Sequence, residues 1–463
     1  MFALLKREVA GKDTMWYQEE EYPPLKPWRC PMPVPIICLD EHVRHFAERF
    51  RKLFSKPQYQ YLVIVLLGLM LCEGRRTLSG LLCQIADRPS LAGLSRFLSE
   101  APWEAATVVT LWLRHFREMM QPKVAAELQR QRQEQPKRRG RPKQPVVTGY
   151  LIGDDSTIEK RKGKKMEGLG RHHSTTQDKR VPGHSLVESL YVLLGQRCPL
   201  APQLYRQQAV CKAEGVPFAS KIDLMETVIR TFEPVAGTVT HILLDTWYSA
   251  KRLWRAARER GFLITSGLKS NRWLRVEDPS APQGWRWQRL SDYTAQLSAS
   301  DYIQLKWPKG DDDVYVHVVT TRVRKLYSCQ VVIVRLSLDA PVSQARYWAS
   351  SDLEASPQML LAHIAARWDI EVLFADGKEE LGLDQYQLMS ATALVRFWTL
   401  AMLAYVFLEE ERHRLQEQWQ RHVTIGEARR QIQRRHRRHV LDWLHGQFQS
   451  GVEPDALYEL LSA

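Results

Sequence analysis

Three acidic residues are placed where their side chains could meet, although they lie far apart along the chain. Asp155 and Asp245 each follow an apolar run that we predict to be a buried strand, in "GYLIGDD" and "VTHILLDTWYS". Open α/β sheets commonly build their sites at the carboxyl ends of such strands. Glu371 lies in "AARWDIEVLFADGKEELGLDQ", where helical spacing puts it on one face with Arg367 and Lys378. The three carboxylates could therefore converge.

A converging set of carboxylates suits divalent cations. Hard cations such as Mg²⁺ prefer carboxylate oxygens and retain several waters. Two such ions about 4 Å apart can clamp an in-line phosphoryl displacement, one activating the attacking hydroxyl or water and the other stabilising the leaving oxygen. The sequence therefore predicts Mg²⁺, for which Mn²⁺ can substitute, held by Asp155, Asp245 and Glu371.

Each of these residues also has an ordinary structural explanation. Acidic residues at strand ends are often helix caps or solvated loop residues. Arg367, Glu371 and Lys378 could instead form an ion-pair ladder on an exposed helix face. Asp154, directly before Asp155, is a second candidate for the first ligand. The pattern of residues alone leaves these alternatives open.

The composition is that of a basic, folded protein. Apolar residues make up 44% and charged residues 25% of the 463-residue chain, which argues against overall disorder. The length corresponds to about three domains. With 66 Lys and Arg against 52 Asp and Glu, the formal charge is +14 and the pI about 9.4. This surplus favours a polyanionic partner such as nucleic acid.

Neither export nor a membrane span is predicted from the sequence. The apolar run "YLVIVLLGLMLC" is shorter than the roughly 20 residues that cross a bilayer, and we predict it to be a buried helix. No charged segment followed by an apolar stretch opens the chain. The seven cysteines form no CxxC pair, so we expect reduced packing residues in a cytoplasmic protein.

The chain changes character along its length. Residues 40–122 have a helical pattern, whereas residues 129–145 are rich in Gln, Pro and Arg and are predicted to form a linker or arm. From Gly149 onward short apolar runs alternate with helical stretches, which is typical of α/β architecture. Residues 270–350 are rich in strand formers and tryptophan, and residues 357–415 are helical again.

Three segments together resemble the DDE transposases of bacterial insertion sequences, in the insertion-sequence-four-like group. They are "DDST" followed by "KRKGKKMEG", then "LLDTWYSAKRLW", and finally "RWDIEVLFADGKEELGLDQYQ". That group carries a Tyr-x2-Arg-x3-Glu-x6-Lys signature. Arg367, Glu371 and Lys378 match it, whereas Ile364 stands at the tyrosine position.

The resemblance also assigns the two aspartates. The first aspartate of the group usually stands in Asp-x-Thr, which selects Asp155 with Thr157 over Asp154. The second matches Asp245. Resemblance to the group therefore implies Asp155, Asp245 and Glu371 as catalytic and metal-binding residues.

The resemblance covers about residues 145–415 and implies an α/β fold: a ribonuclease-H-like catalytic core with a β-rich insertion domain, preceded by an all-α N-terminal domain. The expected organisation is an α-helical N-terminal domain that binds DNA ends (1–122), a basic linker (123–148), the first part of the core (149–268), the insertion domain (269–356), the final core helices with Glu371 (357–415) and a basic helical tail (416–463).

Several basic residues are candidate DNA contacts. The resemblance gives Arg367 and Lys378 a role at the phosphates beside the scissile bond, with Lys160 and Lys164 in the basic run after the first aspartate. Arg139 and Arg141 flank Gly140 and precede Pro142 in "KRRGRPK", which reproduces the core of an AT-hook that could enter an A·T-rich minor groove. A generic basic linker is an equally good explanation of this last segment.

Aromatic and histidine residues are less informative. In relatives, insertion-domain aromatics hold an unstacked base, and Trp residues 254, 273, 285, 287, 307 and 348 lie between Asp245 and Glu371. Packing in the core is the simpler expectation for any one of them. Histidines 172, 173 and 184 follow the first aspartate, and the resemblance gives them no metal role.

The resemblance implies a transposase that acts as a dimer on terminal inverted repeats and on target DNA. In the group, water cleaves the transposon end, the freed 3′ hydroxyl forms a hairpin, and the same hydroxyl later joins target DNA. Two alternatives remain: a metal-dependent nuclease of the same fold, and a domesticated DNA-binding protein without chemistry. A binding protein has no need of three converging carboxylates.

Overall fold

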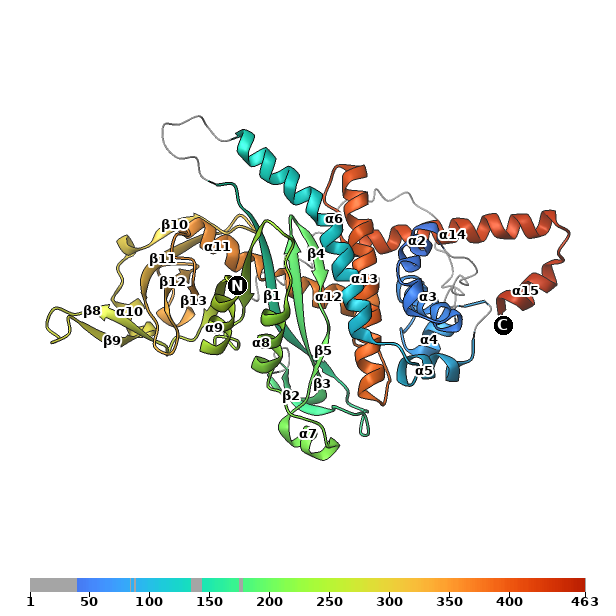
Figure 1. Ribbon diagram of the computed structural model, residues 1–463, viewed down its shortest axis with the longest axis horizontal. Helices are drawn as coiled ribbons and strands as arrows, with labels where there is room; N and C mark the ends of the chain where they lie inside the picture. The colour runs from blue at the N-terminus through green and yellow to red at the C-terminus, as the bar shows by residue number, and fades with distance from the viewer. Residues whose placement is uncertain (1–39, 84, 87–88, 135–143, 175–177, 463) are drawn as a thin grey trace, which may run out of the picture. The chain divides into compact units, whose positions relative to one another are not determined.

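In the computed structural model, residues 40–83, 85–86, 89–134, 144–174 and 178–462 are described (Figure 1). Arg139 and Arg141 lie outside the described residues, as do Cys30 and Cys38. Of the described cysteines, Cys83, Cys198, Cys211 and Cys329 are free thiols.

Thirteen strands are found in the described residues. They are β1 (Val147–Glu159), β2 (Gly170–Ser174), β3 (Lys179–Leu193), β4 (Gln196–Pro199), β5 (Gln203–Tyr205), β6 (Thr238–Leu244), β7 (Leu263–Leu268), β8 (Trp273–Glu277), β9 (Trp285–Arg289), β10 (Ile303–Lys306), β11 (Asp313–Arg322), β12 (Ser328–Arg335) and β13 (Arg346–Ser350).

Eleven strands form one mixed sheet. The order along it is β10-β11-β12-β13-β7-β6-β1-β3-β2, and β4 and β5 also pair with β3. The central neighbours β1 and β6, and then β6 and β7, are parallel, whereas the other pairs are antiparallel. The remaining two strands, β8 and β9, pair with each other as a hairpin. The predicted α/β class is therefore correct at the level of a large mixed sheet with helices.

The helices carry the labels of Figure 1. They are α2 (Glu41–Glu48), α3 (Lys56–Leu71), α4 (Leu78–Leu82), α5 (Leu91–Ser99), α6 (Ala105–Glu134), α7 (Gln208–Glu214), α8 (Lys221–Thr231), α9 (Lys251–Glu259), α10 (Leu290–Gln296), α11 (Pro357–Ala366), α12 (Asp369–Leu381), α13 (Ala391–Trp419), α14 (Ile425–Gln449) and α15 (Pro454–Ser462).

Helix α13 lies at the centre of the helical part of the fold. It packs against α3, α5, α6, α12 and α14, and against β4 of the sheet (Figure 1). By length and composition α13 could cross a membrane, but 89% of its most apolar window is buried inside the protein. A helix that is apolar on all sides can be a membrane span or a core helix surrounded by other helices, and the burial of α13 fits the core helix.

The N-terminal helices share this core. Buried side chains of α3, including Leu62 and Leu69, belong to one apolar cluster with Phe397 of α13 and Ile152 of β1. The sequence predicts a separate α-helical domain over 1–122, and it correctly predicts a buried helix at "YLVIVLLGLMLC". The described helices have one core in common with the sheet, and the domain boundaries stay a prediction.

Helix α6 runs further than the sequence predicts. Residues 123–134 were expected to belong to the linker, yet α6 continues to Glu134. Gln, Arg and Glu are strong helix formers. Arg130 also pairs with Glu127 and Glu134 at 2.7 Å each, and Val124 is buried. Residues 123–134 have no apolar pattern, yet they continue a helix whose buried residues end at Val124.

The β-rich segment continues the central sheet. Strand β13 pairs with β7 in antiparallel register, from Tyr347 opposite Leu268 to Ser350 opposite Thr265. Strands β10 to β12 follow outward from β13. Strands β10 to β13 thus extend the sheet that carries β1 and β6, whereas β8 and β9 form a separate hairpin, and the insertion domain stays a prediction.

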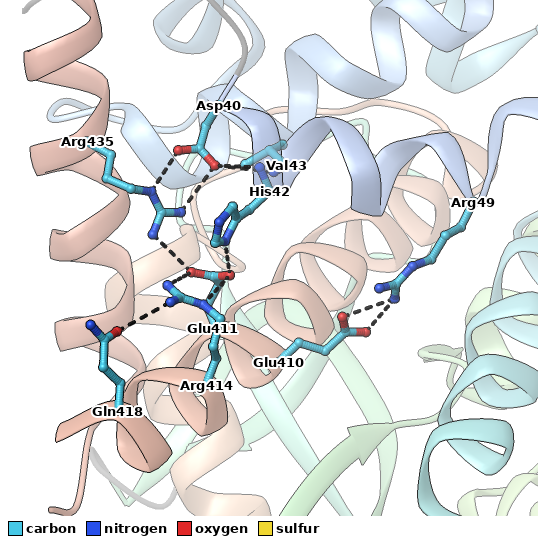
Figure 2. A network of polar contacts seen from close by, with 9 residues as sticks. All are labelled: Asp40, His42, Val43, Arg49, Glu410, Glu411, Arg414, Gln418 and Arg435. Atoms are coloured by element: carbon cyan, nitrogen blue, oxygen red, sulfur yellow. Dashed lines mark hydrogen bonds and ion pairs between the residues drawn. The ribbon is translucent and has the colours of Figure 1, made fainter. Parts of the chain in front are cut away.

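A network of buried charges fastens α2 to α13 and α14 (Figure 2). Asp40 caps α2 by accepting the N–H of His42 at 3.0 Å, and it also accepts hydrogen bonds from Arg435 at 2.8 and 3.1 Å. Arg435 donates in addition to Glu411 at 3.1 Å, which Arg414 contacts at 2.8 Å. Burial alone raises the pKa of Asp40, but the hydrogen bonds and charge of Arg435 hold that pKa below its usual value.

We expect Arg435→Met to lower the free energy of unfolding by about 3 kcal/mol, because it leaves the buried Asp40 and Glu411 without their shared cation. Arg437→Met is the matched control on the same helix. Its pair with Glu73 is more exposed, at 54% and 38%, so we expect a loss of about 0.5 kcal/mol or less. Urea denaturation measures both; equal losses in the two variants would contradict the role given to the network.

Candidate active site

Strand β1 places two adjacent aspartates in different surroundings. Successive side chains of a strand point to opposite faces of the sheet. Asp154 accepts a hydrogen bond from Arg367 Nη1 at 3.1 Å. Asp155 instead pairs with Lys221 on α8 and accepts a hydrogen bond from the Tyr248 hydroxyl at 3.1 Å. Only Asp154 therefore contacts the arginine that precedes α12.

The register of the central strands brings Asp245 level with Asp154. Strands β1 and β6 run parallel, with Gly153 opposite Leu244 as the last pair. Asp154 is the next residue of β1, and Asp245 directly follows the end of β6. Neighbouring strands lie about 4.8 Å apart. Asp245 Oδ1 accepts the backbone N–H of Trp247 at 2.6 Å and of Tyr248 at 3.3 Å. These bonds fix one carboxylate oxygen at the strand end.

Helix α12 brings the third carboxylate to Asp154. Glu371 lies in its first turn, and Arg367 Nη2 donates to Glu371 Oε1 at 2.5 Å while its Nη1 contacts Asp154. Lys378 Nζ donates to Ser156 Oγ at 2.8 Å. Ser156 and Asp154 are two residues apart and so share a face of β1. The predicted stripe of Arg367, Glu371 and Lys378 therefore faces Asp154 and Ser156.

The electrostatics of this cluster call for a cation. Burial raises the pKa of Asp154 to about 7; the charge of Arg367 opposes this shift and those of Asp245 and Asp155 add to it. Burial likewise raises the pKa of Asp245, with the Trp247 N–H and Arg367 opposing and Asp155 adding. Carboxylate oxygens are the donors that hard divalent cations prefer. Asp154, Asp245 and Glu371 fit such an ion, and Arg367 is the cation that bridges two of them here.

The sequence was also compared with known protein families and structures. Residues 49–326 match the family described as DDE superfamily endonuclease. The match covers more than half of the chain. The chain belongs to the DDE superfamily of endonucleases. Enzymes of this superfamily generally use divalent metal ions. The matched region contains Asp154, Asp155 and Asp245, and it ends before Glu371.

No curated protein matches this DDE endonuclease. Among solved structures it is similar to a piggyBac transposase in a synaptic complex with hairpin DNA, at 10% identity and a TM-score of 0.42. The similarity covers 91% of this chain and 80% of that one.

The two candidate first aspartates of this DDE endonuclease have different partners, and the choice between them stays a prediction. Asp155, which the Asp-x-Thr pattern selects, contacts Lys221 and Tyr248. Tyr248 also donates its backbone N–H to Asp245 at 3.3 Å. Asp154-x-Ser156 has the same spacing and lies on the face that α12 covers.

The predicted DNA contacts fall into different places. Lys160 is taken up inside the protein, where its Nζ donates to the backbone oxygens of Asp384 at 2.6 Å and Tyr386 at 2.7 Å. It also lies 3.6 Å from the centre of the Tyr386 ring. Lys164 is exposed. The roles of both lysines in DNA binding stay predictions.

Two residues near the site were missed by the sequence analysis. Glu188 lies opposite Asp154 in the β1–β3 register and is fully buried; its Oε2 has no hydrogen-bond partner among the described residues. The signal was a single acidic residue within the apolar run "SLVESLYV". Trp247, two residues after Asp245, is 64% exposed. The only signal for Trp247 in the sequence was its position two residues after the strand-end aspartate.

The tryptophans named from the sequence have varied settings. Trp254 is buried and donates to Ser266 Oγ at 3.2 Å, so it is a packing residue. Trp307 and Trp348 pack on a small apolar cluster under α11. Trp285 and Trp287 meet edge to face on the β8–β9 hairpin, with centroids 5.6 Å apart, and Arg275 lies over Trp285. Trp254 therefore has the expected packing role. On the β8–β9 hairpin, by contrast, tryptophan rings lie beside an arginine.

Proposed function

We propose that this DDE endonuclease is a DNA transposase of the insertion-sequence-four-like group. It would bind transposon ends, cleave them and transfer their 3′ hydroxyls to target DNA. The observation that carries the proposal is the bridge from Asp154 through Arg367 to Glu371, on the face where the register aligns Asp154 with Asp245. This constellation joins three distant parts of the sequence.

The carboxylates of Asp154, Asp245 and Glu371 would hold Mg²⁺. When bound, the ions lower the pKa of an attacking water and stabilise the oxygen that leaves phosphorus. We place Asp154, in preference to Asp155, among the ligands because it shares a face with Glu371. Asp155 would support the site from the other side of β1 through Tyr248.

The chain's own cations would orient the DNA. Arg367 and Lys378 lie on the same helical stripe as Glu371, so they can contact the phosphates on either side of the scissile bond. The Arg367 guanidinium bridges Asp154 and Glu371 here, and it could donate to phosphate oxygens if those carboxylates held metal. The exposed ring of Trp247 offers a surface for an unstacked base beside Asp245.

The proposed reaction is a series of phosphoryl transfers. Water attacks phosphorus at the transposon end and the 3′ oxygen leaves. That hydroxyl then attacks the opposite strand, and the 3′ oxygen of the flanking DNA leaves as a hairpin forms. A second water opens the hairpin and restores the 3′ hydroxyl, which attacks a target phosphodiester and displaces a 3′ oxygen of the target. The net charge of +14 supports binding to both DNAs. Two ends must be cleaved together, so we expect a dimer on paired ends.

The test is incubation of the full chain with linear DNA that carries the inverted repeats flanking its gene, with Mg²⁺ present. Cleavage together with joining to a second DNA supports the transposase. Cleavage without joining would favour a nuclease of the same superfamily. A salt-sensitive mobility shift without cleavage would indicate a DNA-binding protein that has lost its chemistry.

A further inference from the structure

A second cluster of possible metal ligands lies on the same side of the sheet, away from the three carboxylates. It consists of His241 on β6, Asp352 just after β13 and His363 on α11. One donor atom from each residue lies within 4.8 Å of the other two. Three elements that are distant in sequence are thus joined at this point.

The two histidines are buried with one ring nitrogen each left unsatisfied. His241 is 0% and His363 5% exposed. Among the described residues, neither His241 Nδ1 nor His363 Nε2 has a hydrogen-bond partner. An unpaired polar atom in a buried position is costly, so two such atoms in one place need an explanation.

The other ring nitrogens are held by neighbours. His241 Nε2 is 2.8 Å from Thr265 Oγ, which itself donates to Ser350 Oγ at 2.9 Å. Thr265 must therefore accept from His241 Nε2–H, which leaves a bare lone pair on Nδ1. His363 Nδ1 is 3.1 Å from the Tyr150 hydroxyl. Metal-binding histidines are oriented in this way by partners of their second nitrogen.

Asp352 supplies a carboxylate at the more accessible edge of the cluster. Its Oδ1 accepts the Glu354 N–H at 3.1 Å, and its own N–H donates to Ser350 Oγ at 3.2 Å. The residue is half-buried, so the side chain can rotate toward the two imidazoles. Around a tetrahedral zinc ion with bonds of about 2.0 Å, neighbouring ligand atoms are about 3.3 Å apart. The ligand atoms, which lie within 4.8 Å of one another here, would therefore have to approach by up to about 1.5 Å when the ion binds.

We propose that His241, His363 and Asp352 bind one Zn²⁺ ion, with water as the fourth ligand. Two neutral imidazoles and one carboxylate suit a borderline cation of this kind, whereas Mg²⁺ prefers oxygen ligands only. The ion would fasten α11 to β6 and to the end of β13. Helix α11 leads into Arg367 and α12, and Asp245 directly follows β6, so the ion holds the two sides of the active site in register.

The experiment compares zinc content and cobalt spectra in the full chain. The protein, freed of metal by a chelator and kept in excess Mg²⁺ to occupy carboxylate sites, is titrated with Zn²⁺ and dialysed before elemental analysis. We expect about one retained Zn²⁺ per chain in the wild type, and a fall of tenfold or more in Asp352→Asn and His363→Asn. His317→Asn is the control, since both nitrogens of His317 already have partners.

Cobalt provides a reading that needs no variant. Co²⁺ bound by imidazole, carboxylate and water in four- or five-coordinate geometry absorbs visible light much more strongly than the hydrated ion. We expect this absorption in the wild type, and its loss when Zn²⁺ is added. The proposal is overturned if the wild type retains no zinc and binds cobalt only as the weakly absorbing hydrated form. It is equally overturned if Asp352→Asn and His363→Asn, folded as the wild type is, retain as much zinc as His317→Asn.

Discussion

Asp154→Asn is expected to reduce DNA cleavage by about 10³-fold or more, because it removes a carboxylate from ions that supply several kcal/mol of transition-state stabilisation. Asp155→Asn is expected to retain activity within about tenfold, since it changes only the supporting contacts of Asp155 with Tyr248, Lys221 and Ser185. The two substitutions are the same chemical change at adjacent positions of one strand. Rates of cleavage at saturating Mg²⁺ measure the difference.

DNA binding provides the control for this comparison. Both proteins should bind end DNA with the wild-type affinity, because neither aspartate is expected to contact DNA directly. If Asp155→Asn is inactive and Asp154→Asn is active, the first catalytic aspartate is Asp155, as the Asp-x-Thr motif predicts.

Glu371→Gln is expected to lower cleavage by a similar factor, about 10³-fold. The amide keeps the size of the side chain and can still accept a hydrogen bond from Arg367, so α12 should stay in place. What is lost is one negative charge and one anionic metal ligand. The measurement is the cleavage rate together with the midpoint of thermal unfolding, which should change little.

Glu379→Gln is the matched control for Glu371. It lies on the same helix at an exposed position, and the same chemical change there should leave the rate within about twofold of the wild type. If Glu371→Gln cleaves DNA as fast as Glu379→Gln, the third acidic residue of the site must be sought elsewhere. Glu188, fully buried opposite Asp154, would then be the next candidate.

The elements that carry the site were accessible from sequence because their apolar patterns are strong. The run before Asp245 is a strand with five consecutive buried residues, and Gly261 follows helix α9 with a positive φ of 68° that favours glycine. The stripe of Arg367, Glu371 and Lys378 follows from helical spacing alone. Periodicity and helix endings are local properties, so one sequence suffices to predict them.

The choice between Asp154 and Asp155 was not accessible in the same way. Both are polar residues at the end of one strand, and the residues that distinguish them, Arg367 and Lys221, come from α12 and α8. Which face of β1 each helix covers depends on the packing of the whole sheet. The cluster of His241, Asp352 and His363 was missed for the same reason, since no spacing along the chain connects its members.

The length of helix α6 and the path of the β-rich strands also depended on tertiary structure. A Gln- and Arg-rich sequence has good helix propensity but no apolar pattern to predict packing, and α6 forms there because its earlier turns are already anchored. Strand β13 joins β7 although more than 70 residues separate them. Such non-local pairing carries no local sequence signal.

The position of a bound divalent ion would show whether Asp154, Asp245 and Glu371 form the metal site. Crystals of the full chain with end DNA and Mn²⁺ would locate manganese by its anomalous scattering. We expect manganese in contact with carboxylate oxygens of Asp154, Asp245 and Glu371, next to the scissile phosphate. Manganese bound by Asp155 with no contact to Glu371, or its absence from all three carboxylates while DNA is cleaved, would contradict it.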